Sequence, residues 1–278
     1  MLIAVVPNQI KTENNDLVRA VCQKLAGLGA KVRLVCAENS LPTATQLTEA
    51  LNGCDMAVAV GGDGTIMHVA KAAASKGIPV LGINGGHLGF LAGAEPEDLD
   101  GLQALFRDGY RKDKRHLLEV TVHTSAGDKS LLAMNDVVVS RGSLSRLVDV
   151  MVRSGESAVL NCRGDGVIVA TPTGSTAYSL SAGGPVVDPE VRCLLVTPVC
   201  PHSLDSRSRV LPHEVVLTLQ AATADGNPAF VTVDGELNIP LTPTDMVTIR
   251  VSDTAVSLIQ LTDIHFYDKL RHKLLDRR

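Results

Sequence analysis

The chain is poor in aromatic residues: its 278 residues include four phenylalanines, three tyrosines and no tryptophan. Hydrophobic residues nevertheless make up 45% of the sequence, so a core has to be built mainly from Val, Leu, Ile and Ala. The 24 glycines and 13 prolines favour a turn-rich α/β or β-rich fold. A chain of this length can form one large or two medium domains, each with its own core.

Excess positive charge and long apolar runs are also missing. The formal net charge is −4, which argues against broad nucleic-acid binding, because such binding needs clustered Lys and Arg. No stretch reaches the roughly 18 consecutive apolar residues of a membrane span. The apolar start Leu2–Val6 has no basic residues before it and no cleavage site after it, so we interpret it as a strand and not a signal peptide. These features indicate a cytosolic protein without nucleic-acid or membrane partners.

The six cysteines form no Cys-x-x-Cys pair, and most lie in apolar runs. They are therefore expected to be buried free thiols in a reducing compartment. The eight histidines show no metal-site spacing, and no protein metal site is predicted.

Residues 1–98 alternate between strand-like and helix-like patterns. Continuous apolar runs, typical of strands buried on both faces, occur at Leu2–Val6, Val32–Cys36, Met56–Val60 and Ile78–Leu81. Apolar residues recur with helical spacing between Leu17 and Leu28. This succession predicts an α/β N-terminal domain with a parallel sheet.

Residues 99–262 follow a different pattern. Short β-rich runs are separated by Gly, Asp, Asn and Ser, at Leu117–Val122, Val137–Ser140, Val148–Val152, Val167–Ala170, Leu194–Thr197, Val215–Leu219, Ala229–Val233 and Met246–Val251. Such spacing predicts an all-β C-terminal domain. Helical spacing returns from Phe266 to Leu274, so residues 263–278 are predicted to form a helix that packs back on the first domain.

The sharpest local motif is Gly61-Gly62-Asp63-Gly64-Thr65, between an apolar strand and a helical pattern. Glycines let a backbone approach phosphate oxygens closely, and a helix N-terminus offers unpaired N–H groups. The motif is neither Gly-x-Gly-x-x-Gly nor the Walker sequence. A tight turn capped by Asp63 is the structural alternative. The carboxylate is unusual beside phosphates, because it repels them unless a metal or a role in proton transfer accounts for it.

A second motif runs from Gly164 to Pro185 and is rich in hydroxyl side chains. A strand enters a Ser/Thr-rich turn that is followed by Tyr178. Small hydroxyls suit the polar edges of a base and a ribose, and a tyrosine ring offers stacking. A purely structural Ser/Thr turn is the alternative.

A third and weaker motif is Asn135-Asp136, which precedes an apolar strand and has Arg141, Arg146 and Arg163 nearby in the sequence. Asn and Asp before a strand are usually turn residues, so this pair gains meaning only together with the other motifs.

Together the three motifs resemble those of the NAD kinase family, which combines a GGDGT loop, an Asn-Glu or Asn-Asp pair and the run TPTGSTAYSLSAGGP. The resemblance also includes Gly86–Leu91 and Pro198–Leu204, and it spans residues 55–240 in the expected order. It implies transfer of the γ-phosphoryl group of ATP to the adenosine ribose 2′-hydroxyl of NAD, at a site between the two domains.

The resemblance also implies a role for each matching residue. Asp63 would be the catalytic residue that orients the 2′-hydroxyl or accepts its proton. Phosphates would lie near Gly61, Gly62, Gly64, Thr65 and His68, and ribose hydroxyls near Asn135 and Asp136, the latter replacing a more common glutamate. The remaining substrate-binding positions would be Arg146, Arg163, Asp165, Thr176, Ala177, Tyr178 and Ser181.

A divalent cation is implied by the triphosphate, and we expect Mg²⁺ held mainly by the phosphates. The partners would be NAD and ATP, and the family suggests a homodimer or homotetramer.

Two other functions compete with this interpretation. A lipid or sphingoid-base kinase would share the phosphate loop but need an apolar acceptor cleft. A dinucleotide sensor would bind NAD without turnover, although the intact Asp63 argues against it. A Ser203 hydrolase is not favoured, because no Gly-x-Ser-x-Gly elbow is present.

Overall fold

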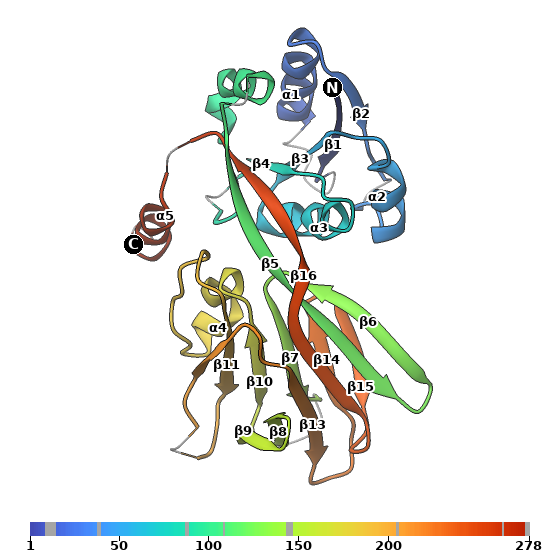
Figure 1. The fold of residues 1–278 in the computed structure, drawn as a ribbon, viewed down its shortest axis with the longest axis vertical. Helices are drawn as coiled ribbons and strands as arrows, with labels where there is room; N and C mark the ends of the chain where they lie inside the picture. Colours follow the sequence, from blue (N-terminus) through green and yellow to red (C-terminus); the bar gives the residue numbers. More distant parts are fainter. Residues whose placement is uncertain are drawn as a thin grey trace. The chain divides into compact units, whose positions relative to one another are not determined.

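A computed structural model describes residues 1–8, 15–37, 40–86, 89–107, 109–142, 147–203, 206–262 and 264–275 (Figure 1). The chain divides into two compact units. The first comprises Met1–Arg115 and Thr254–Arg278, and the second comprises His116–Asp253.

The first unit is built on a parallel sheet in the order β2-β1-β3-β4. Its elements are β1 (Leu2–Pro7), α1 (Asn15–Gly27), β2 (Lys31–Leu34), α2 (Ala44–Ala50), β3 (Met56–Gly61), α3 (Asp63–Ala74), β4 (Val80–Asn84) and a 3-10 segment, η2 (Pro96–Phe106). β1 and β3 pair in parallel, as do β3 and β4. The predicted α/β domain with a parallel sheet is therefore confirmed.

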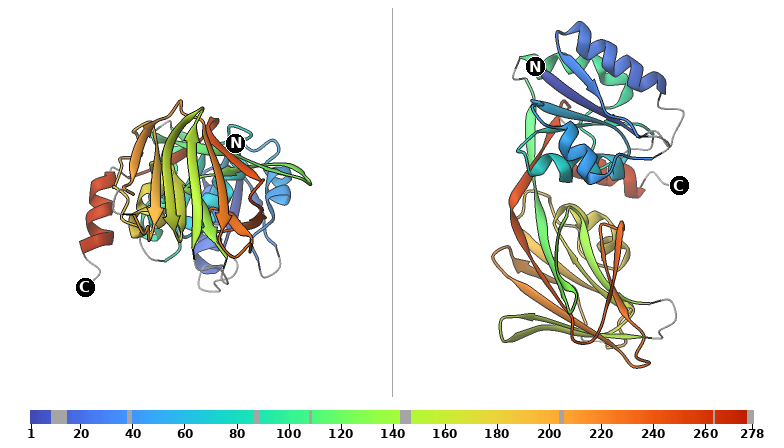
Figure 2. Two further views of the ribbon diagram at one scale, coloured as in Figure 1. Left: turned by 90° about the horizontal axis from the view of Figure 1, so that it is seen from below. Right: turned by 90° about the vertical axis from the view of Figure 1, so that its right-hand side faces the viewer.

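The two faces of this sheet carry side chains of different size. Large residues such as Ile3 and Val58 pack with α1 and η2 in one core. The opposite face presents small residues, and a Cβ added to Gly82 would lie 2.5 Å from the Ile66 side chain of α3. Figure 2 shows α1 and η2 on one face of the sheet and α3 on the other. The small residues let α3 approach closely, which sets the position of the turn that precedes it.

The second unit contains antiparallel strands in two sheets. Its elements are the end of β5 (Arg111–Thr124), β6 (Gly127–Ala133), β7 (Asp136–Arg141), β8 (Val148–Ser154), β9 (Ser157–Gly164), β10 (Gly166–Ala170), η3 (Thr173–Thr176), α4 (Tyr178–Ser181), β11 (Cys193–Val199), β12 (Arg209–Pro212), β13 (Leu217–Thr223), β14 (Ala229–Val233), β15 (Leu237–Leu241) and the start of β16 (Met246–Gln260). One sheet has the order β12-β11-β10-β7-β14-β15. Its Val139 and Val169 pack against Val150 and Leu219 of the other sheet. The β-rich second domain is confirmed.

β16 belongs to both units. Its first half pairs with β13 in the second unit through Val247–Ile249. Its end pairs with β4 in the first unit, where Leu258 lies opposite Val80. The helix α5 (Phe266–Leu275) follows within the first unit, so the predicted C-terminal helix is confirmed.

The spatial division differs from the boundary predicted at residues 98 and 99. Residues 99–115 lie with the first unit, because Leu102 and Leu105 of η2 belong to its core. The alternation of strand-like and helix-like patterns ends near the start of η2 (Pro96–Phe106), whereas the chain stays in the first unit until Arg115.

Several strands were not predicted from the sequence, namely β6, β9, β12 and β15. Each has exposed positions, such as the first four residues of β6, so no long apolar run marks it. All six cysteines are free as predicted, but Cys36 and Cys200 are exposed. Among the described residues, no helix combines the length and the apolar character needed to cross a membrane.

Candidate functional site

The glycine-rich turn joins β3 to α3. Gly62 occupies the N-cap with extended backbone, and Asp63 is the first helical residue. Gly61 has a packing role, since an added Cβ would lie 2.7 Å from Thr65 Oγ1. Among the described residues, none has an atom within 4 Å of a Cβ added to Gly62 or Gly64. These two glycines therefore leave the helix start open to an anion, as the phosphate interpretation requires.

The Asp63 carboxylate holds the segment that follows β4. Its Oδ2 accepts a hydrogen bond from the backbone N–H of Phe90 at 2.9 Å, and its Oδ1 accepts one from Leu91 at 3.0 Å. Lys273 of α5 lies 3.3 Å from Oδ2. The approach is so close that a Cβ on Gly89 would lie 2.2 Å from Oδ1. Asp63 therefore links three stretches of the first unit at the glycine-rich turn.

The side chains of Thr65 and His68, both predicted to lie near phosphates, have partners within the first unit. The Thr65 side chain is buried, and its hydroxyl accepts a hydrogen bond from Asn8 Nδ2 at 3.0 Å. The His68 ring lies on the side of α3 toward Pro42, whose carbonyl oxygen is 2.7 Å from Nε2. Because a carbonyl can only accept, Nε2 carries the proton. Thr65 is thus linked to the segment after β1, and His68 to the segment before α2.

In the second unit, four of the predicted residues line one open cavity of about 390 Å³: Asn135, Asp136, Ala177 and Tyr178. They come from the start of β7 and from the turn into α4. The Tyr178 side chain is exposed, so its ring is available for stacking. The volume falls in the range typical of small-molecule sites.

Asp234 in the same cavity was missed by the sequence analysis. Its carboxylate accepts hydrogen bonds from the consecutive backbone N–H groups of Met134, Asn135 and Asp136, at 2.9, 2.8 and 3.1 Å. Asp234 has a φ of 49° in the tight turn between β14 and β15. The dipeptide Asp234-Gly235 between two strands is typical of a hairpin turn. This was the signal in the sequence that could have identified the turn that holds Asp234.

Asp136 is buried at 6% exposure. Burial, and secondarily the nearby Asp234 carboxylate, raise the pKa of Asp136 from 3.8 to about 7. The group can therefore exist as a neutral hydrogen-bond donor or as an anion near neutral pH, and either form can bind a ribose hydroxyl.

Many hydroxyls of the Ser/Thr-rich run point inward. Thr171 Oγ1 donates to the Met134 carbonyl at 2.7 Å, and Ser175 bonds the backbone of Val187 in both directions. Ser179 lies 2.9 Å from Thr197 Oγ1. Thr171, Ser175 and Ser179 therefore have the purely structural role that the sequence analysis gave as the alternative, because their hydroxyls stabilise the turn.

The other predicted residues of this run are more accessible. Thr176 and Ala177 are partly buried and Ser181 is exposed. The Thr176 hydroxyl donates to the Thr173 carbonyl at 3.3 Å. Ala177 also lines the Asp136 cavity, whereas Thr176 and Ser181 are not among its lining residues.

Asp165 and Arg163 lie away from that cavity. Asp136 pairs with Ala170 at one end of β10, whereas Asp165 precedes the other end. At about 3.3 Å per residue, the strand separates them by roughly 15 Å. Asp165 pairs with Arg141 at 2.6 Å. Arg163 lies 3.9 Å from Asp149 and lines a separate cavity. Strand β10 therefore divides the predicted residues of this unit into two groups.

Arg146 lies outside the described residues, as do His87, Leu88 and Leu204 of the two further motifs. Their predicted involvement stays a prediction.

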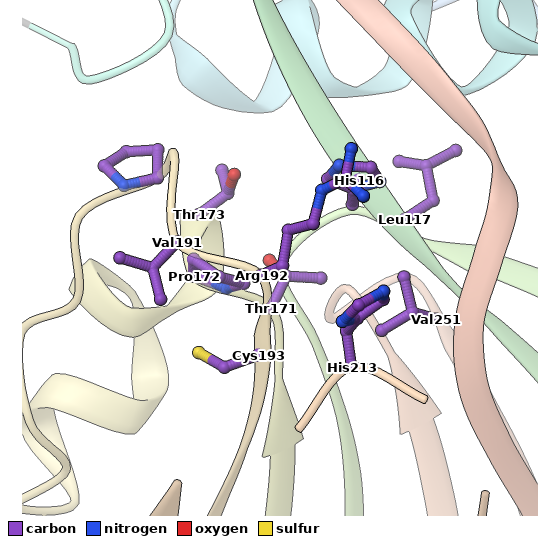
Figure 3. Close-up of a pocket in the computed structure, with 11 residues that line it drawn as sticks. His116, Leu117, Thr171, Pro172, Thr173, Val191, Arg192, Cys193, His213 and Val251 are labelled. Carbon is purple, nitrogen blue, oxygen red and sulfur yellow. The ribbon is translucent and has the colours of Figure 1, made fainter. Parts of the chain in front are cut away.

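A much narrower pocket, of about 10 Å³, adjoins the start of the Ser/Thr-rich run (Figure 3). Its lining is basic and apolar, and includes His116, Thr171–Thr173, Arg192, Cys193 and His213. Burial raises the pKa of the Cys193 thiol, so it is a poor nucleophile there. None of the predicted site residues that the structure describes lines this pocket. The acidic Asp136 cavity therefore remains the candidate substrate site of the second unit.

Comparison with known protein families gives matches over most of the chain. Residues 3–110 match the ATP-NAD kinase N-terminal domain. Residues 134–261 match the ATP-NAD kinase C-terminal domain.

Individual proteins agree. The chain is 46% identical over 222 residues to an NAD kinase of Symbiobacterium thermophilum, covering 79% of this chain and 78% of that one. It is 35% identical over 285 residues to an NAD kinase of Caldanaerobacter subterraneus subsp. tengcongensis, covering 99% of both.

Two solved structures share the fold. The yeast NADH kinase complexed with NADH has a TM-score of 0.85 at 23% identity, over 100% of this chain and 88% of that one. An NAD kinase from Archaeoglobus fulgidus in complex with ATP has a TM-score of 0.76 at 26% identity, over 98% and 99%. Two matching domains in the family's order, and relatives similar over the full length, place this chain in the NAD kinase family.

Proposed function

We propose that the protein phosphorylates NAD, transferring the γ-phosphoryl group of ATP to the 2′-hydroxyl of the adenosine ribose. The observation that carries this proposal is the open glycine turn at the start of α3, with a carboxylate beside it, in a member of the NAD kinase family. The related structures with NADH and ATP bound support a dinucleotide and a nucleoside triphosphate as substrates. No comparison favours a lipid kinase or a sensor.

In this proposal Asp63 orients the acceptor hydroxyl. An aspartate carboxylate is a weak base at neutral pH, and phosphoryl transfer depends mainly on positioning and charge neutralisation. The hydrogen bonds from the backbone N–H groups of Phe90 and Leu91 fix the orientation of the Asp63 carboxylate. Among the described residues, Oδ1 accepts only the hydrogen bond from Leu91, and we assign its second lone pair to the substrate hydroxyl.

The remaining roles are divided between the two units. The open positions at Gly62 and Gly64 would admit phosphates to the N–H groups at the start of α3. Asn135 and Asp136 would bind ribose hydroxyls, and Tyr178 would stack on a base. Asp234 would keep the first two in place through its backbone hydrogen bonds.

The proposed reaction uses Mg²⁺, which neutralises phosphate charge when bound with the triphosphate. The described residues include no group of three or more His, Cys, Asp or Glu that could hold a metal ion. At the glycine turn, the Asp63 oxygens already accept two backbone hydrogen bonds. The donor set therefore fits a cation whose ligands are mostly phosphate oxygens and water.

The test is NADP formation by the purified protein from NAD, ATP and Mg²⁺. Asp63→Asn should lower kcat by at least about 100-fold, because an amide presents an N–H₂ where the carboxylate accepts. NAD affinity should change little, since we assign the dinucleotide contacts mainly to the second unit.

Asp16→Asn is the matched control, because the Asp16 side chain is 96% exposed. It should leave the rate unchanged. A wild-type protein that forms no NADP would refute the proposed function, and wild-type turnover in Asp63→Asn would refute the role of Asp63.

We also propose that the protein forms a homodimer or a homotetramer, because the resemblance to the NAD kinase family suggests one of these states. Light scattering coupled to size-exclusion chromatography would measure the mass, and a monomer at working concentration would contradict this.

A further inference from the structure

The C-terminal helix α5 places a lysine side chain beside the glycine-rich turn at the start of α3. Phe266, Lys269 and Lys273 recur at helical spacing on one face. The Phe266 ring lies 6.1 Å from that of Phe90. Lys269 is buried at 7% exposure, and its Nζ donates to the Ala92 carbonyl at 2.6 Å. This face of α5 therefore packs on the segment whose backbone Asp63 holds.

Lys273 is located by two contacts at the C-terminal end of that face. Its Nζ lies 3.3 Å from Asp63 Oδ2 and 4.4 Å from the centre of the Phe90 ring. The side chains of Lys273 and Asp63 are 26% and 31% exposed, so solvent screens the pair only in part. The ring and the carboxylate together hold the ammonium group beside the turn.

The position of Lys273 bears on the repulsion between the Asp63 carboxylate and bound phosphates. A carboxylate at the entrance of α3 repels the phosphates that the open glycine turn admits, and its repulsion is strongest where water is partly excluded. The Lys273 ammonium, 3.3 Å from Asp63 Oδ2, carries the opposite charge and therefore opposes that field. The two backbone N–H groups that also bond Asp63 carry no net charge and cannot do this.

We propose that Lys273 is a positioning residue for phosphoryl transfer: it neutralises Asp63, so that the carboxylate can stand next to the triphosphate. The role rests on the proposed function, since it assumes a triphosphate at the turn. Lys273 acts through Asp63 and not by contact with the substrate. The C-terminal helix is thereby part of the phosphate site of the first unit.

The proposal is tested by a double-mutant cycle on Mg²⁺-ATP binding, measured by calorimetry without NAD. Lys273→Met should weaken ATP binding about tenfold when Asp63 is present, which corresponds to about 1.4 kcal/mol. In an Asp63→Asn background the same change should cost less than about twofold, because no carboxylate remains to be neutralised. Lys273→Arg should restore binding to within about threefold of wild type.

Arg271→Met is the matched control, since Arg271 is an exposed cation on the same helix. It should leave ATP binding unchanged. Equal losses from Lys273→Met in both backgrounds would overturn the proposal, because they would indicate direct contact or a general loss of structure. No loss in either background would also overturn it. A wild-type protein that makes NADP but shows no coupling refutes only the role of Lys273, whereas failure to make NADP refutes the proposed function.

Discussion

The aspartates Asp63 and Asp136 show how the surroundings of one side chain set its chemistry. Asp63 is partly exposed; its carboxylate accepts two backbone hydrogen bonds and lies beside the Lys273 ammonium. Asp136 is buried beside a second carboxylate, and both circumstances favour its neutral form. Asp63 therefore lies among hydrogen-bond donors and a cation, whereas the surroundings of Asp136 bring the pKa of its carboxyl close to neutral pH.

The raised pKa of Asp136 predicts a pH-dependent stability. Between about pH 4 and pH 7 the unfolded chain releases this proton while the folded protein keeps it. The wild type therefore loses stability as the pH rises through this window, by up to roughly 4 kcal/mol at pH 7 and above. Asp136→Asn removes this loss, so its stability relative to wild type should rise from pH 4 to pH 7. Urea unfolding at a series of pH values measures the difference.

Asp253→Asn serves as the control, because the Asp253 side chain is 99% exposed. Its difference from wild type should stay nearly constant over the same range. A constant difference for Asp136→Asn as well would show that Asp136 ionises normally in the folded protein.

At the scale of elements, the turn after β10 and the start of β7 form one structure. Thr171 bonds the backbone of Met134, and Gly174 packs on that of Asn135. A Cβ on Gly174 would lie 2.1 Å from the Asn135 carbonyl oxygen, which as backbone cannot move away independently. The glycine is therefore required where two segments of the candidate substrate site touch.

Gly174→Ala should lower the free energy of unfolding by about 2–3 kcal/mol, because overpacking forces the backbone to shift. It should also weaken NAD binding, since the shift moves Asn135 and Asp136. Thermal unfolding and NAD titration measure the two effects.

Gly27→Ala is the comparison, as nothing lies within 4 Å of an added Cβ at the end of α1. It should stabilise the protein by up to about 1 kcal/mol and leave NAD binding unchanged. A Gly174→Ala protein as stable as wild type would mean that the contact with Asn135 relaxes without cost.

At the scale of the whole chain, the first unit is assembled from both ends of the sequence. Its core includes Ile259, which reaches it only after the chain has completed the second unit. The main core of the second unit contains only residues between 118 and 249. The two units therefore differ in their ability to fold from a single continuous segment.

A fragment of residues 116–253 is expected to fold by itself, with a cooperative thermal transition and a β-type circular dichroism spectrum. A fragment of residues 1–115 should not, because β4 would lose its partner at Leu258 and Ile259 and expose an edge. Absence of a transition in the first fragment, or a cooperative one in the second, would contradict this division.

Much of the fold follows from local patterns. The apolar run Met56–Val60 and the glycine turn after it predict a strand, a turn and a helix start, because each depends on neighbours in the sequence. The polar strand β9 was missed, since half of its residues face solvent and the pattern does not distinguish it from a loop.

The candidate site could be predicted only in part. Motifs named Asp63, Asn135, Asp136, Tyr178 and Thr65 as candidates, and these stay predictions. The structure adds that the Thr65 side chain is buried and hydrogen-bonded to Asn8. Which hydroxyl turns inward depends on partners that lie far away in the sequence, as Ser179 and Thr197 do.

The amino-acid sequence alone determined the two classes of domain, the open helix start at Gly62 and the helix at the C-terminus, because periodicity and turn chemistry act over a few residues. Only the tertiary structure decided that Asp234 holds the backbone of Asn135, 99 positions away, and that Lys273 meets Asp63 across 210 positions. Charges and hydrogen-bond partners at such separations are set by how strands and helices pack, and no local pattern encodes that packing.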